Sequence, residues 1–127
     1  MTTRKLRGMA VAVTAVVALA ILASAASAAA PHKISVDDNF FKPKKVTVDV
    51  GDRVTWKWDG YVAHNVTVEK GPQKFKSKTK ADGTFSRVIK KAGVYRIVCT
   101  LHPGMTMRLT AVKAPPPTTG PTAPPST

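Results

Sequence analysis

Short runs of alternating polar and apolar residues, separated by turn residues, most constrain how this chain can fold. In residues 53–58, for example, Val54, Trp56 and Trp58 fall on one face and polar residues on the other. This period of two is typical of half-buried β-strands, and no helical period interrupts it. We therefore predict an all-β protein, an antiparallel β-sandwich or barrel of about seven to eight strands. The expected strands are residues 33–36, 40–41, 45–50, 53–58, 64–69, 84–89, 94–99 and 106–112.

One long connection separates the fifth and sixth of these runs. Residues 70–83 are polar and lysine-rich and contain a Gly-Pro pair. Gly and Pro mark turns and loops rather than the interior of a strand. We therefore expect residues 70–83 to form a surface excursion.

The N-terminal residues 1–30 have the organisation of a secretory signal peptide. Arg4, Lys5 and Arg7 precede an apolar stretch, which ends in a run of small residues with Ala-x-Ala triplets. We expect cleavage after Ala28 or Ala29, and hence an extracytoplasmic protein, periplasmic or secreted. Retention of the segment as a membrane anchor is the alternative, although its second half is weakly apolar.

The remaining chain divides into a folded domain and a tail. Residues 31–113 hold all of the alternating runs, whereas residues 114–127 consist of Pro, Thr, Ala, Gly and Ser and are expected to stay disordered. Without the three basic signal residues, 17 of the 20 Lys and Arg remain against 7 Asp and Glu, a formal charge of +10. Such a charge favours anionic partners. We do not expect nucleic acid to be one, because the protein is exported and has no recognition motif.

The chemistry of the chain is concentrated around its one cysteine, Cys99. In an exported protein, an unpaired cysteine forms an intermolecular bridge, acts as a reactive thiol or binds a metal. His102, Met105 and Met107 follow within a few residues, around a Pro-Gly turn. Thiolate, imidazole and thioether donors together favour copper. A second imidazole would have to come from elsewhere, and His64 is a candidate, although nothing in the spacing places it beside Cys99.

These motifs resemble those of the cupredoxins, the small blue-copper proteins, and in particular amicyanin and the plastocyanin-like group. The resemblance extends from residue 33 to residue 112 and rests on several motifs that occur together. They are His-Asn-Val at 64–66, Cys-x-x-His-x-x-Met at 99–105, Phe-Phe-Lys-Pro at 40–43, the pattern of residues 46–56, and Gly-Val-Tyr at 93–95.

The resemblance implies an eight-stranded Greek-key β-sandwich that binds one mononuclear copper. It assigns His64, Cys99, His102 and Met105 as the copper ligands. It also implies that Asn65, next to the first ligand, hydrogen-bonds across to the cysteine loop and stiffens the site.

Two methionines compete for the axial position. The short ligand loop of amicyanin-like proteins would use Met105, whereas the longer plastocyanin-like loop would use Met107. We favour Met105, because Met107 alternates in phase with Leu109 and Ala111 and should point into the core.

The implied function is electron transfer between redox proteins, and not catalysis, because no open coordination position is needed. The edge of His102 would reach the surface within an apolar patch. The basic surface predicts partners with an acidic docking surface, or peripheral contact with an anionic membrane or cell wall. We expect a monomer. The candidate residues of the apolar patch around His102 are Leu101, Pro103, Gly104, and Tyr61 or Val62.

Three other interpretations remain open at this stage. The domain could be an extracytoplasmic copper chaperone or storage module, or a metal-free β-sandwich that binds the cell surface. A zinc site is also conceivable, but structural zinc requires four strong ligands and methionine is a poor one.

Overall fold

The structure, a computed structural model, describes residues 29–116, which form two packed β-sheets without a helix in that range. The predicted signal peptide and tail fall almost wholly outside these residues. Within them, no helix is long and apolar enough to cross a membrane. The strands are β1 (Pro31–Asp37), β2 (Phe40–Lys42), β3 (Lys45–Asp49), β4 (Arg53–Trp58), β5 (Thr67–Lys70), β6 (Thr84–Val88), β7 (Gly93–Val98) and β8 (Thr106–Val112).

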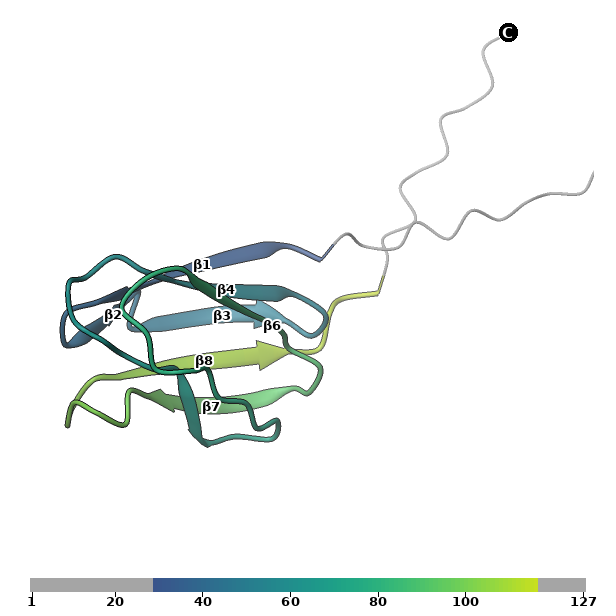
Figure 1. The fold of residues 1–127 in the computed structure, drawn as a ribbon. Helices are drawn as coiled ribbons and strands as arrows, with labels where there is room; N and C mark the ends of the chain where they lie inside the picture. Colours follow the sequence, from purple (N-terminus) through teal and green to yellow (C-terminus); the bar gives the residue numbers. More distant parts are fainter. Residues whose placement is uncertain (1–28, 117–127) are drawn as a thin grey trace, which may run out of the picture.

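The two sheets have four strands each, in the orders β2-β1-β4-β6 and β3-β8-β7-β5. The predicted β-sandwich is confirmed. Most strand pairs are antiparallel, but β1 pairs with β4 and β3 pairs with β8 in parallel, so both sheets are mixed. The parallel pairs arise because the chain crosses between the sheets before each partner strand is added. The β7–β8 loop lies at the end of the sandwich opposite to the start of β1 and the end of β8 (Figure 1).

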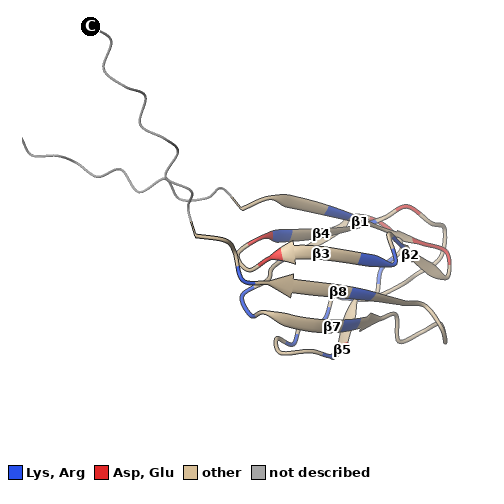
Figure 2. Cartoon of the chain, turned by 180° about the vertical axis from the view of Figure 1, so that it is seen from behind, with Lys and Arg blue, Asp and Glu red and all other residues tan. Residues whose placement is uncertain are grey.

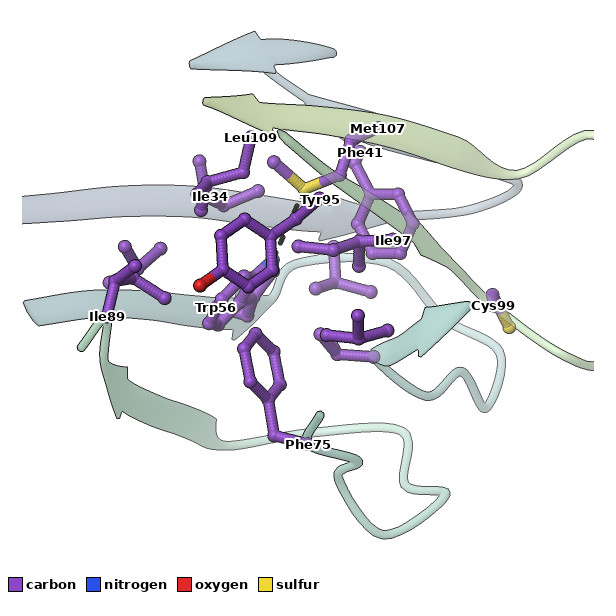
Figure 3. Packing of buried hydrophobic residues seen from close by; sticks show 14 of the residues in the cluster. Ile34, Phe41, Trp56, Phe75, Ile89, Tyr95, Ile97, Cys99, Met107 and Leu109 are labelled. Carbon is purple, nitrogen blue, oxygen red and sulfur yellow. Dashed lines mark hydrogen bonds between the residues drawn. The ribbon is translucent and has the colours of Figure 1, made fainter. Parts of the chain in front are cut away.

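The core lies between the sheets and contains the residues that the alternation of β4 predicted. Val54, Trp56 and Trp58 are buried, while Arg53 and Lys57 between them are exposed. Trp56 packs against aromatic rings from the rest of the chain (Figure 3). This burial is the main source of stability available to a domain of this size.

The prediction for residues 70–83 was wrong in one respect. Phe75 and Ser77 are buried, and the ring of Phe75 lies 5.6 Å from that of Trp56. The backbone on either side of Phe75 is also paired, since Val68 N–H donates to the Phe75 carbonyl at 3.0 Å and Ser77 N–H donates to the Val66 carbonyl at 2.8 Å. A single aromatic side chain among exposed lysines therefore anchors the segment to the core.

The expected strand 64–69 was also displaced. The strand β5 begins at Thr67, and His64 forms only an isolated bridge with Lys80. Regular pairing with β7 begins only at Thr67, and Asn65 instead contacts Cys99 and Thr100 just beyond the end of β7. This departure from regular pairing places His64 among the loops.

A buried carboxylate fastens the N-terminal strand to the β3–β4 turn. Asp52 accepts hydrogen bonds from Ala30 N–H and Asp49 N–H, both at 2.9 Å, and contacts His32 Nε2 at 2.8 Å. Burial raises the pKa of Asp52, but the hydrogen bonds from Asp49, His32 and Ala30 outweigh it, and the pKa lies below its ordinary value.

Replacement of Asp52 by asparagine is therefore expected to lower the free energy of unfolding at pH 7 by about 1–3 kcal/mol. Because the folded-state pKa is depressed, the stabilising effect is present above the ordinary carboxyl pKa of 3.8 and is lost as the pH falls through the folded-state value. Urea unfolding of wild type and Asp52→Asn from pH 7 to pH 2 measures this difference. The exposed Asp82→Asn is the control. A difference that stayed constant across that range would contradict the prediction.

Candidate metal centre

The β7–β8 loop holds three of the predicted ligands on one tight turn. Cys99 follows the last residue of β7, and its N–H donates to the Met105 carbonyl at 3.0 Å. Met105 N–H in turn donates to the His102 carbonyl at 3.1 Å. Gly104 has a φ of 84°, a left-handed conformation that glycine adopts without strain. These two backbone hydrogen bonds close the loop on itself and fix the backbone that carries Cys99, His102 and Met105.

His64 reaches this loop from the connection between β4 and β5. Its backbone N–H and C=O both pair with Lys80 at 3.0 Å, and its carbonyl accepts a hydrogen bond from Trp58 Nε1 at 3.2 Å. The side chain is fully buried. Packing and backbone hydrogen bonds thus hold the imidazole in one place before any metal is considered.

Three donor atoms from these two segments converge. The Nδ1 atoms of His64 and His102 lie 3.0 Å apart, and Cys99 Sγ lies 3.9 Å from the first and 3.6 Å from the second. Metal–nitrogen bonds of about 2.0–2.1 Å and metal–sulfur bonds of about 2.3 Å require donor separations of roughly this size around one ion. All three ligand atoms lie within 4.8 Å of one another, so the side chains fit a single metal.

The two candidate axial methionines have different surroundings. Both are buried. Met107 lies in the core, where its sulfur accepts a hydrogen bond from Trp56 Nε1 at 3.4 Å, and Figure 3 shows it well away from Cys99. Met105 is instead tied through its backbone to Cys99 and His102. The sulfur of Met107 is therefore already engaged in the core.

Asn65 connects the two segments that carry the donors. Its Nδ2 donates to Thr100 Oγ1 at 2.7 Å, and its Oδ1 accepts the Thr100 N–H at 3.1 Å. The Asn65 N–H points at Cys99 Sγ from 3.5 Å. Hydrogen bonds of this kind orient ligand side chains and reduce the negative charge that a thiolate must carry alone.

One residue next to the site was not identified from the sequence. Asp38 Oδ1 lies 3.4 Å from His64 Nε2, on the side of the ring away from the other donors. The Val62 N–H contributes most to holding the pKa of Asp38 below its ordinary value; desolvation opposes this, and Tyr61 N–H and His64 add to the lowering. In the sequence, Asp38 lies between the expected strands 33–36 and 40–41, outside every motif identified there. No local pattern connects it with a histidine 26 residues away.

Two imidazoles and a thiol converging at the loop end of a β-sandwich define a mononuclear site for a soft metal. A family model described as copper binding proteins, plastocyanin/azurin family, matches residues 28–113. The chain belongs to this family, and the predicted resemblance to cupredoxins is confirmed. Copper is the cofactor of the family, and the donor set of this chain suits it. No curated protein matches the chain significantly in sequence.

Solved structures agree with this assignment. A novel purple cupredoxin from Nitrosopumilus maritimus is 26% identical with a TM-score of 0.59, over 64% of this chain and 99% of that one. A reduced Cu(I) form of an amicyanin mutant is 26% identical with a TM-score of 0.56, over 71% of this chain and 88% of that one. A copper-containing nitrite reductase from Thermus scotoductus SA-01 shares the fold at 22% identity and a TM-score of 0.61. It matches over 67% of this chain, which spans only 23% of that enzyme.

Proposed function

We propose that this protein is an exported blue-copper protein that carries single electrons between redox partners. His64, Cys99 and His102 would bind one copper ion, with Met105 as a weak axial ligand. The observation that carries the proposal is the triangle of two Nδ1 atoms and one Sγ, with sides of 3.0, 3.6 and 3.9 Å. Copper in such a donor set supplies a one-electron couple.

The surroundings of the donors suit a carrier better than an enzyme. His64, Cys99 and Met105 are buried, and the backbone hydrogen bonds of the ligand loop restrain its movement. A rigid site changes little between oxidation states, which favours rapid one-electron exchange. The nitrite reductase shares a fold with this chain, which accounts for under a quarter of that enzyme's length.

His102 offers a route for the electron. It is half-buried, whereas His64 is fully buried. Next to it in sequence Leu101 is 49% exposed, and on the β4–β5 loop Tyr61 is 95% exposed. We infer that these exposed apolar residues, with Val62, Pro103 and Gly104, form the contact patch through which a partner approaches the metal.

The charged flank of the sandwich supports an acidic partner. Lys45, Arg108 and Arg96 occupy directly paired positions on β3, β8 and β7, and all three are exposed (Figure 2). Like charges in cross-strand pairs repel one another. Arg96 is already paired with the carboxylate of Glu69, so the carboxylates of an acidic partner would relieve this repulsion mainly at Lys45 and Arg108. Arg96 and Arg108 lie three residues from Cys99 and Met105 respectively. A partner bound to the flank would therefore be close to the metal.

Export is part of the same proposal. It rests on the signal-peptide pattern of residues 1–30. An extracytoplasmic carrier would meet redox partners outside the cytoplasm, and its basic surface could contact an anionic envelope. We propose that the folded domain acts as a monomer.

The proposed function is tested by electron exchange with small reagents of opposite charge. The copper-loaded, reduced domain is mixed in a stopped-flow instrument with an anionic oxidant and, separately, with a cationic one. We expect a strong visible band to appear and disappear reversibly on oxidation and reduction. The rate with the anionic reagent should fall as salt increases, and the rate with the cationic reagent should rise. A protein that binds copper without reversible redox cycling would contradict the carrier function.

A further inference from the structure

The carboxylate of Asp38 binds the backbone of the loop that follows β4. Its Oδ1 accepts hydrogen bonds from Tyr61 N–H at 2.9 Å and Val62 N–H at 3.1 Å, and lies 3.4 Å from His64 Nε2. Asp38 belongs to the turn between β1 and β2, whereas its three neighbours follow β4. The carboxylate therefore links two loops at the metal end of the sandwich.

The loop is shaped for this carboxylate. A Cβ on Gly60 would lie 2.8 Å from both the Cγ and the backbone nitrogen of Asp38, closer than real Cβ contacts allow. Only glycine lets the backbone wrap around the carboxylate so closely. The combination of a glycine and two converging N–H donors indicates that the position of Asp38 is built into the fold.

The orientation of His64 explains what the carboxylate does there. The Nδ1 of His64 faces Cys99 and His102, so a metal would bind to that nitrogen. A neutral imidazole that binds a metal through Nδ1 carries its proton on Nε2. That nitrogen points towards Asp38, which as a carboxylate can only accept a hydrogen bond.

We propose that Asp38 is a positioning residue of the copper site: its carboxylate accepts the Nε2–H of His64, fixes the ring and its tautomer, and favours the oxidised metal through its negative charge. The inference rests on the proposed copper site. A fixed negative charge beside a ligand stabilises Cu(II) more than Cu(I), because the interaction scales with the charge of the ion. It should therefore lower the reduction potential.

Replacement of Asp38 by asparagine tests the effect of the charge. The amide oxygen can still accept the hydrogen bonds, so the shape of the loop is retained while the charge is lost. We expect the ratio of Cu(II) to Cu(I) affinity to fall about tenfold, which raises the one-electron potential by about 59 mV. Equilibrium redox titration of the copper-loaded protein measures it.

Asp59→Asn is the matched control. Asp59 lies at the start of the loop that closes around Asp38 and carries the same charge, but its carboxylate contacts Lys57 and Ser35 and not His64. We expect no comparable shift in this variant. An equal shift in Asp38→Asn and Asp59→Asn would reduce the effect to general electrostatics and overturn the inference.

A second variant, Asp38→Ala, removes the acceptor itself. In the diamagnetic Cu(I) protein, the His64 Nε2 proton should exchange slowly with water in wild type and Asp38→Asn, and rapidly in Asp38→Ala, as seen by ¹⁵N NMR. Copper release to a chelator should accelerate by about 10–100-fold. If the alanine variant does not fold, the asparagine variant still decides the matter.

The outcomes separate this inference from the proposed function. A wild-type protein without a thiolate-to-copper absorption band would overturn both. If the wild-type protein has that band but the potential is unchanged in Asp38→Asn and the His64 proton exchange is unchanged in Asp38→Ala, the role of Asp38 alone is overturned.

Discussion

Replacement of Cys99 by serine is expected to abolish the intense visible absorption of the copper-loaded protein and to weaken copper binding by more than about 100-fold. The thiolate is the soft donor that favours copper and produces the thiolate-to-copper absorption, and a serine hydroxyl supplies neither property. The two imidazoles would remain, so the variant is expected to bind Cu(II) only weakly and without an intense colour. The measurement is an absorption and electron-spin-resonance titration with Cu(II).

The fold should survive this change. Cys99 is buried, and its N–H bond to the Met105 carbonyl involves only the backbone. Serine differs from cysteine by one atom. The free energy of unfolding of the metal-free Cys99→Ser protein therefore serves as the control and should stay within about 1–3 kcal/mol of wild type. A persistent visible band in a folded Cys99→Ser protein would rule out the proposed site.

The second large effect concerns the two methionines. Met105→Leu is expected to shift the visible spectrum and raise the reduction potential, because the weak axial ligand tunes the oxidised state. Its effect on stability should be small, since Leu and Met have similar volumes. Spectra and redox titration of the copper-loaded variant measure the change.

Met107→Leu provides the matched comparison, with the opposite result. It leaves the buried Trp56 Nε1–H without the sulfur that accepts its hydrogen bond, which is expected to cost about 1–3 kcal/mol of unfolding free energy. The spectrum should remain that of wild type. If Met107→Leu changed the spectrum while Met105→Leu did not, the axial assignment would have to be reversed.

The two methionines show what a sequence pattern can predict about a side chain and what it cannot. The alternation of Met107 with Leu109 and Ala111 predicted a core position, and all three side chains are buried. The limits of β8 were also predicted correctly, because its pattern is regular and turns bound it on both sides. The assignment of Met105 as the axial ligand remains a prediction.

Polar and apolar alternation did not predict burial where a single apolar residue stands among polar ones. Phe75 lies in a lysine-rich segment with no period, and its burial depends on the rings of Trp56, Phe85 and Tyr95, which come from other strands. Nor could alternation distinguish a parallel from an antiparallel partner. The pairings of β1 with β4 and of β3 with β8 depend on how the chain crosses between sheets.

In the metal centre, too, local sequence predicted some features, whereas others depend on the packing of distant strands. Cys99, His102 and Met105 are close in sequence, so local spacing and donor chemistry were enough to predict a copper-binding loop. The approach of His64 to that loop and of Asp38 to His64 arises only when the strands pack, because contacts between distant residues depend on sheet pairing, which no local pattern encodes. The sequence alone therefore indicates which metal the protein selects, whereas the packed sandwich brings the second imidazole and the carboxylate behind it into place.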